Sequence, residues 1–125
     1  MQTDTLLLLC ALHSFAFAAF HLAFWRLFDW PRTLASTTVA NRAILPIANV
    51  QLIWVFVGVG LLCVAYPDEL AGTALGRALL AGMSGFWILR TLTQLVWLRV
   101  NRPLVHVLTA LFVLGAILFA APLLR

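Results

Sequence analysis

Long apolar stretches separated by short polar breaks are the dominant pattern in this sequence of 125 residues. At ~1.5 Å per helical residue, four of the stretches are long enough to cross a hydrocarbon layer about 30 Å thick. They predict helices at residues 5–28, 43–65, 73–99 and 104–121. The breaks between them contain Pro31, Pro67 and Pro103, which end or begin helices. The pattern predicts an all-α fold, a transmembrane four-helix bundle that forms a single integral membrane domain over residues 1–125.

The composition of the chain supports the same class. Hydrophobic residues make up 64% of the sequence and charged residues 10%, whereas about a quarter of an ordinary soluble domain is charged. The net charge of +4 comes from basic residues at segment ends, which favours a topology signal over nucleic-acid binding. The first and third connections carry Arg26, Arg32, Arg42, Arg99 and Arg102, against Arg77 and Arg125 on the other side. This bias predicts that both termini lie outside the cytoplasm.

Arg90 is the residue around which a candidate site is expected. It lies roughly 13 Å along the third segment from Arg99, well inside the hydrocarbon layer. An arginine at such a depth costs ~2.5–3.5 kcal/mol on insertion scales, so its side chain is expected to face protein or water. Helical spacing places Arg90 on one stripe with Met83, Trp87 and Gln94.

Polar residues from all four segments fall in the same leaflet as Arg90. The five that are predicted to form one polar, ligand-binding cluster, roughly 6–13 Å deep, are His21, Asn49, Arg90, Gln94 and His106. Within this cluster, His21 and Arg90 are predicted to share one pocket. Gln51 lies about 200° around the helix from Asn49, so it is expected to face away.

Two interpretations of Arg90 are open. In the first, Arg90 locks the bundle, because Asn49, Gln94, His21 and helix carbonyls take its donors. In the second, Arg90 binds an anion, because Asp29 at the interface is the only acid on its side of the membrane. An unneutralised cation in a low dielectric attracts a lipid phosphate, a carboxylate or a small inorganic anion.

Metal and cofactor chemistry have little support in the sequence. The three histidines and two cysteines show no metal-ligand spacing, so neither a metal nor a cofactor is expected. A haem held by His21 and His106 is the alternative that the spacing leaves open.

Two resemblances to known families bear on these interpretations. The layout is similar to that of the membrane-associated glutathione and eicosanoid enzyme family, which has four spans and an Arg-Ala pair followed by Asn in its second helix. Arg42, Ala43 and Asn49 match this motif in part, since the asparagine comes later and the following glutamate is absent. The wider combination resembles a group of small bacterial four-span membrane proteins; it comprises His21, Phe24-Trp25, Asn41-Arg42-Ala43-Ile44, Asn49, Leu75-Gly76-Arg77-Ala78-Leu79-Leu80, Phe86-Trp87, Leu89-Arg90 and Gln94. That resemblance covers most of the chain and implies a bacterial cytoplasmic membrane, but no activity.

The sequence favours a non-enzymatic membrane protein whose cytoplasm-side intramembrane site binds an anionic small molecule or lipid head group, or docks onto a membrane assembly. One alternative is a membrane-embedded enzyme acting on a lipophilic or thiol substrate, with Arg90 as the electrostatic element and His21 as acid or base. The other is a small oligomeric transporter or channel. The expected partners are membrane lipids and either further copies of the chain or a larger membrane complex, and no nucleic acid.

Overall fold

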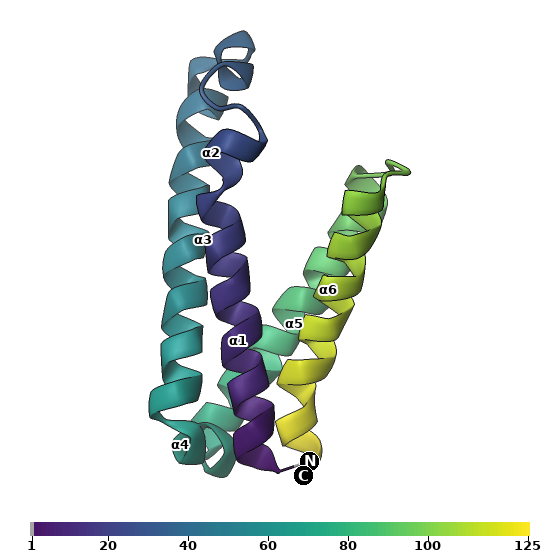
Figure 1. Ribbon diagram of the computed structural model, residues 1–125. Helices are drawn as coiled ribbons and strands as arrows, with labels where there is room; N and C mark the ends of the chain where they lie inside the picture. Colours follow the sequence, from purple (N-terminus) through teal and green to yellow (C-terminus); the bar gives the residue numbers. More distant parts are fainter. Residues whose placement is uncertain (1) are drawn as a thin grey trace. The chain divides into compact units, whose positions relative to one another are not determined.

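A computed structural model describes residues 2–125, and helices account for most of this part of the chain. They are α1 (Thr3–Leu22), α2 (Phe24–Leu27), η1 (Thr33–Ser36), α3 (Val39–Ala65), α4 (Pro67–Gly72), α5 (Ala74–Trp97), α6 (Pro103–Ala120) and η2 (Ala121–Leu124), where η denotes a 3-10 helix (Figure 1). Four helices, α1, α3, α5 and α6 extended by η2, are long and apolar enough to cross a membrane. The prediction of an all-α fold with four such helices is confirmed.

The contacts between residues divide the chain into two compact units. Unit 1 comprises the chain up to Cys10 together with Leu62–Arg125, and unit 2 comprises Ala11–Leu61. The boundaries therefore fall within α1 and within α3. The single domain expected over residues 1–125 stays a prediction.

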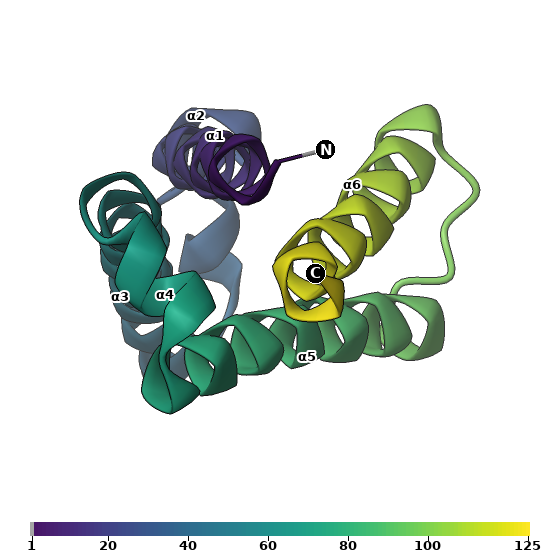
Figure 2. The same cartoon turned by 90° about the horizontal axis from the view of Figure 1, so that it is seen from below.

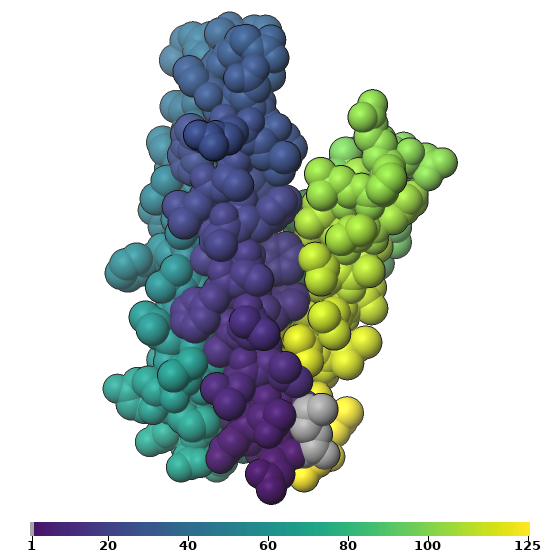
Figure 3. Space-filling model, viewed as in Figure 1, coloured from purple at the N-terminus to yellow at the C-terminus, as the bar shows by residue number. Residues whose placement is uncertain are grey.

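Unit 2 is built on the parts of α1 and α3 that run side by side (Figures 1 and 2). Their side chains meet along the face that Figure 3 shows. Aromatic rings fill the contact, with the Phe56 centroid 6.1 Å from that of Phe17 and 5.2 Å from that of His21. Gly60 allows the two helices to approach, because a Cβ atom there would lie 2.5 Å from Cε1 of Phe15.

The first membrane helix ends earlier than the sequence predicted. α1 stops at Leu22 and α2 begins at Phe24 after a turn, so the continuous helix expected over residues 5–28 is wrong at its end. The amide of Ala23 bonds to the carbonyl of Phe20 at 3.1 Å, which tightens the last turn. The carbonyl of His21 instead accepts a hydrogen bond from a side chain of α3, as described below. Such an intrusion into the helical ladder is a known cause of helix breaks.

The second membrane helix begins earlier than predicted, at Val39 and not at residue 43. The hydroxyl of Thr38 accepts a hydrogen bond from the amide of Asn41 at 3.3 Å, so Thr38 caps the helix from just outside it. Pro46 consequently lies about two turns inside α3, and not in the first turn of a helix beginning at residue 43. The later part of the polar break before residue 43 thus forms this cap and the first turn of α3.

Unit 1 places α4 tightly against the start of α5. A Cβ atom on Gly76 would lie 2.2 Å from the carbonyl oxygen of Glu69 and 2.5 Å from Cα of Leu70, so only glycine fits there. Thr73 caps α5 by accepting a hydrogen bond from the amide of Gly76 at 3.0 Å. Arg77 donates to the carbonyl of Leu123 at 2.7 Å, which ties α5 to η2.

The pair formed by α5 and α6 is the main feature of unit 1, and the two helices lie side by side in Figures 1 and 2. The hydroxyl of Ser84 donates to the carbonyl of Ala116 at 2.8 Å. From the start of α1, the thiol of Cys10 donates to the carbonyl of Leu118 in α6 at 3.2 Å. The observed bounds of α5 and α6 differ from the predicted ones by only one or two residues.

Candidate functional site

Asn49 is the buried polar residue of α3 in unit 2, with 4% of its surface exposed. Its Nδ2 donates to the backbone carbonyl of His21 at 2.8 Å, next to the point where α1 ends. Gln51 is exposed, as its different position around the helix indicates. Asn49 therefore has a structural role, because its hydrogen bond joins α3 to the end of α1 in a layer without water.

His21 is held within its own helix and among aromatic rings. Its Nδ1 lies 2.8 Å from the carbonyl oxygen of Phe17, and because a carbonyl can only accept, Nδ1 carries a proton. The imidazole stacks on Phe24 at 4.4 Å between centroids and with an interplanar angle of 26°. These contacts orient the ring, and they place His21 and Asn49 next to one another in unit 2.

Arg90 lies beside two packed aromatic rings in unit 1. Its guanidinium carbon is 4.6 Å from the centroid of the Phe112 ring in α6, a cation–π contact. On the same ring, Trp87 stacks at 5.5 Å with an interplanar angle of 18°. Trp87 is 1% exposed, whereas Arg90 is exposed, so the guanidinium lies at the edge of a packed aromatic pair.

The guanidinium of Arg90 makes no hydrogen bond or ion pair with another described residue. The only ion pair between side chains in residues 2–125 joins Arg32 to Asp29, in the connection after α2. The four acids of the chain are Asp4, Asp29, Asp68 and Glu69, which lie at helix ends or in connections. The face of a ring stabilises the cation electrostatically. It provides no oxygen acceptor in the plane of the guanidinium for the five N–H donors.

Gln94 is buried between α5 and α6, with 1% of its surface exposed. Its Nε2 donates to the carbonyl of Val105 at 3.2 Å and to the hydroxyl of Thr109 at 3.0 Å. Because Val105 offers only an acceptor, the amide nitrogen must point toward it and Oε1 must point elsewhere. Oε1 is buried and has no hydrogen-bond partner among the described residues.

His106 lies at the start of α6, next to the connection that joins it to α5. Its Nε2 is 2.7 Å from Oδ1 of Asn101, and since an amide oxygen only accepts, Nε2 carries the proton. Gln94 and His106 line the same pocket at this end of the helix pair, together with Arg99. Its volume is about 280 Å³.

The predicted cluster of five residues thus falls into two groups. His21 and Asn49 meet in unit 2, and Gln94 and His106 share a pocket in unit 1. Arg90 belongs to unit 1 but does not line that pocket. The shared pocket of His21 and Arg90 would join the two units and stays a prediction.

Several residues of these sites did not stand out in the sequence. Phe112, which carries the Arg90 contact, is one of nine phenylalanines, and aromatic residues are common in apolar helices. Thr109 and Ser84 form hydrogen bonds across the α5–α6 contact. Their signal was a hydroxyl in the middle of an apolar stretch, which indicates a bond to a neighbouring helix.

No group of three or more His, Cys, Asp or Glu side chains within residues 2–125 is arranged to hold a metal ion. Cys10 and Cys63 are both buried free thiols. Comparisons of the chain with protein-family models, curated proteins and solved structures find no match. The residues of the site are therefore the basis for a functional proposal.

Proposed function

We propose that this chain is a small, non-enzymatic integral membrane protein that binds an anionic group at Arg90. The observation that carries the proposal is the guanidinium of Arg90, which rests on Phe112 and has no acidic or carbonyl partner among the described residues. Because four helices are long and apolar enough to cross a membrane, the layer around Arg90 is the hydrocarbon layer of that membrane.

The energetics of a charge in a membrane support this proposal. Arg90 lies seven residues before the end of α5 at Trp97, or about 10 Å along the helix axis. The cation–π contact contributes ~0.5–2 kcal/mol, which is less than the ~2.5–3.5 kcal/mol that insertion of a central arginine costs. A carboxylate or a phosphate would accept two parallel N–H bonds from the guanidinium and would neutralise it.

The membrane and its sidedness are part of the proposal. Arginines concentrate in the α1–α3 and α5–α6 connections, which supports an orientation with both termini outside the cytoplasm, and the resemblance to small bacterial four-span proteins implies a bacterial cytoplasmic membrane. The anion would then approach Arg90 from the cytoplasmic side. Labelling of single cysteines at Thr38 and Thr73 in intact cells tests this orientation, and a membrane-impermeant reagent that reaches Thr38→Cys from outside would refute it.

Substitution of Arg90 by methionine tests the binding role, because methionine removes the charge and roughly keeps the volume. The probes are acetate and laurate, which present the same carboxylate from solution and from the lipid layer. Stabilisation of the wild type by acetate would indicate a soluble ligand, and stabilisation by laurate alone would indicate an amphiphile.

We expect the rise in melting temperature with the effective probe to vanish in Arg90→Met and to persist in Arg102→Met. Arg102 is an exposed arginine of the α5–α6 connection, so it controls for loss of a positive charge. If Arg90→Met is folded and its melting temperature still rises as in the wild type, Arg90 is not the binding residue. If neither probe stabilises the wild type, binding of a carboxylate at this site is refuted.

A further inference from the structure

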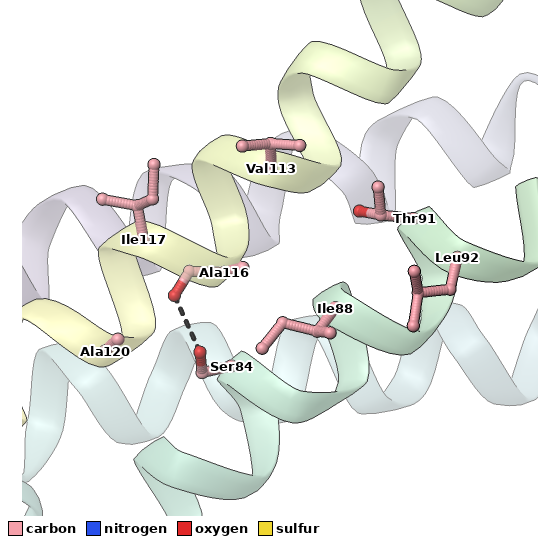
Figure 4. A pocket seen from close by; sticks show the side chains of 8 residues that line it. All are labelled: Ser84, Ile88, Thr91, Leu92, Val113, Ala116, Ile117 and Ala120. Atoms are coloured by element: carbon pink, nitrogen blue, oxygen red, sulfur yellow. Dashed lines mark hydrogen bonds between the residues drawn. The ribbon is translucent and has the colours of Figure 1, made fainter. Parts of the chain in front are cut away.

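The pair α5–α6 has an apolar groove that Arg90 does not line. The groove, of about 350 Å³, runs between the two helices on one face of the pair, as Figure 4 shows. Ile88 and Leu92 line it from α5, and Val113 and Ile117 line it from α6. The hydroxyl of Ser84 is already bonded to the carbonyl of Ala116, so the walls offer little to a polar ligand.

The pocket that contains Gln94 and His106 lies on the same face, closer to the α5–α6 connection. On α5, Ile88 and Leu92 of the groove are followed at a helical step of three by Leu95 of the pocket, and the pocket continues beyond the end of α5 at Trp97 to Arg99. On α6, Val113 is likewise four residues from Thr109. Arg90 is about 200° around the helix from Ile88 and lines neither space, whereas Gln94, four residues after Arg90, reaches the pocket from the side of α5 that contacts α6. The groove and the pocket thus follow one another along a single side of the pair.

The polar end offers one buried acceptor without a partner in the described chain, on Gln94, and one exposed cation, Arg99. Oε1 of Gln94 is a buried acceptor without a donor, and the other amide atom is fixed by Val105 and Thr109. Arg99 uses its Nε on the carbonyl of Leu95 at 3.3 Å, and its two terminal nitrogens make no bond to the described residues. A ligand that fits this end needs an O–H or N–H donor for Gln94 and an anionic group for Arg99.

The length and polarity of the face match one molecule of membrane lipid. From Ser84 to Leu98 the groove and pocket extend about 20 Å along α5, more than one leaflet of a hydrocarbon core about 30 Å thick. Trp97 is 78% exposed beside the polar end, as expected for an aromatic residue at the membrane–water interface. The apolar groove thus points into the layer, and the polar pocket lies near its surface.

We propose that this face binds one phospholipid whose head group carries a hydrogen-bond donor. One acyl chain lies in the apolar groove, the phosphate pairs with Arg99, and the ammonium of ethanolamine or a hydroxyl of glycerol donates to Gln94. A choline head group has no N–H or O–H donor, so it would leave Oε1 of Gln94 unsatisfied. The proposal does not depend on an anion at Arg90, because different residues form the two sites.

Native mass spectrometry of the full chain tests the proposal by lipid competition. The purified protein in a neutral detergent receives equal amounts of phosphatidylethanolamine, phosphatidylglycerol and phosphatidylcholine with identical acyl chains. We expect the first two to be retained at least about fivefold more than phosphatidylcholine, the factor that corresponds to one buried hydrogen bond. Equal retention of all three lipids by the wild type would overturn the proposal without any variant.

Two variants and their controls assign the effect to named residues. Gln94→Met should reduce the preference over phosphatidylcholine to about one, whereas Gln51→Met, at an exposed glutamine of α3, should leave it unchanged. Arg99→Gln should lower retention of all three lipids, and Arg102→Gln should not. A folded Gln94→Met protein that keeps the preference, or an Arg99→Gln protein that retains lipid as the wild type does, would refute the assignment.

Discussion

The α1–α3 contact in unit 2 and the α5–α6 contact in unit 1 are both made between membrane helices, but by different means. Rings of Phe17, His21 and Phe56 fill the first, with Asn49 as the one amide that crosses it. In the second, hydrogen bonds from Ser84 and Gln94 cross to α6. Unit 2 thus relies on aromatic packing around one polar contact, and unit 1 on a ladder of polar contacts.

The difference shows how a polar residue in a membrane helix can be assigned a role. Nδ2 of Asn49 is committed to a backbone carbonyl of the neighbouring helix α1, which is a structural role. The guanidinium of Arg90 contacts only a ring, and Oε1 of Gln94 contacts no donor in the described chain. Residues of the second kind are the candidates for ligand binding, because a ligand can supply what the protein does not.

The largest effect on stability is expected from Gly76→Ala in unit 1. The new Cβ would meet the backbone of Glu69 and Leu70, which cannot rotate away, so α4 and α5 must separate. We expect a loss of about 3 kcal/mol in the free energy of unfolding, at the upper end for overpacking. Gly60→Ala in unit 2 should cost less than about 1 kcal/mol, because the ring of Phe15 can move aside.

Reversible unfolding in mixed micelles measures both glycine variants. Gly82→Ala is the control, since a Cβ there meets nothing within 4 Å and alanine favours a helix by about 1 kcal/mol. A loss in Gly76→Ala no greater than that in Gly60→Ala would show that backbone contact does not distinguish the two units. Destabilisation by Gly82→Ala would point to a second copy of the chain at that surface.

A smaller loss is expected from Asn49→Leu. The hydrogen bond from Asn49 to the carbonyl of His21 would be lost, while the unpaired Oδ1 of Asn49 would also disappear, so we expect a net cost of about 1–2 kcal/mol. Gln51→Leu, on an exposed face of the same helix, should change the free energy of unfolding little. Equal effects of the two substitutions on stability in mixed micelles would remove the structural role assigned to Asn49.

The smallest effect is expected from a pair of serine variants, one in each unit. Ser84→Ala removes the hydrogen bond to Ala116 and should cost about 0.6 kcal/mol, the average for such bonds between membrane helices. Ser14 is fully buried and its hydroxyl has no partner in the described chain, so Ser14→Ala should be neutral or slightly stabilising. The same unfolding measurement would contradict this contrast if Ser14→Ala proved the more harmful change.

Much of the fold could be predicted because length and apolarity are local properties of the chain. The four long helices were expected from these properties alone, and α5 and α6 were placed within one or two residues. The ends of α1 and the start of α3 were not, because Asn49 acts on α1 from another helix and Thr38 caps α3 in a polar run. A break or a cap that depends on one side chain leaves little trace in an apolar pattern.

The candidate site was less predictable than the fold. Helical spacing gave the depth of Arg90 and Gln94 and put them on one stripe, but not their different partners. Arg90 meets the ring of Phe112, whereas Gln94 meets Val105 and Thr109 and lines a pocket with His106. Spacing along a helix fixes the side of that helix on which a residue lies, and it leaves open which side of the next helix faces it.

The sequence by itself determined that the chain is helical, that four segments are long and apolar enough to span a membrane, and that Arg90 lies within one of them. Only the tertiary structure decided which carbonyl Asn49 satisfies, which glycine is in close contact and which polar atoms are left without partners. The physical reason is that lipid is as apolar as a packed helix face, so apolar residues do not reveal which face is buried. In this chain the faces are set by a few hydrogen bonds and close contacts between helices, and these exist only after the helices have packed.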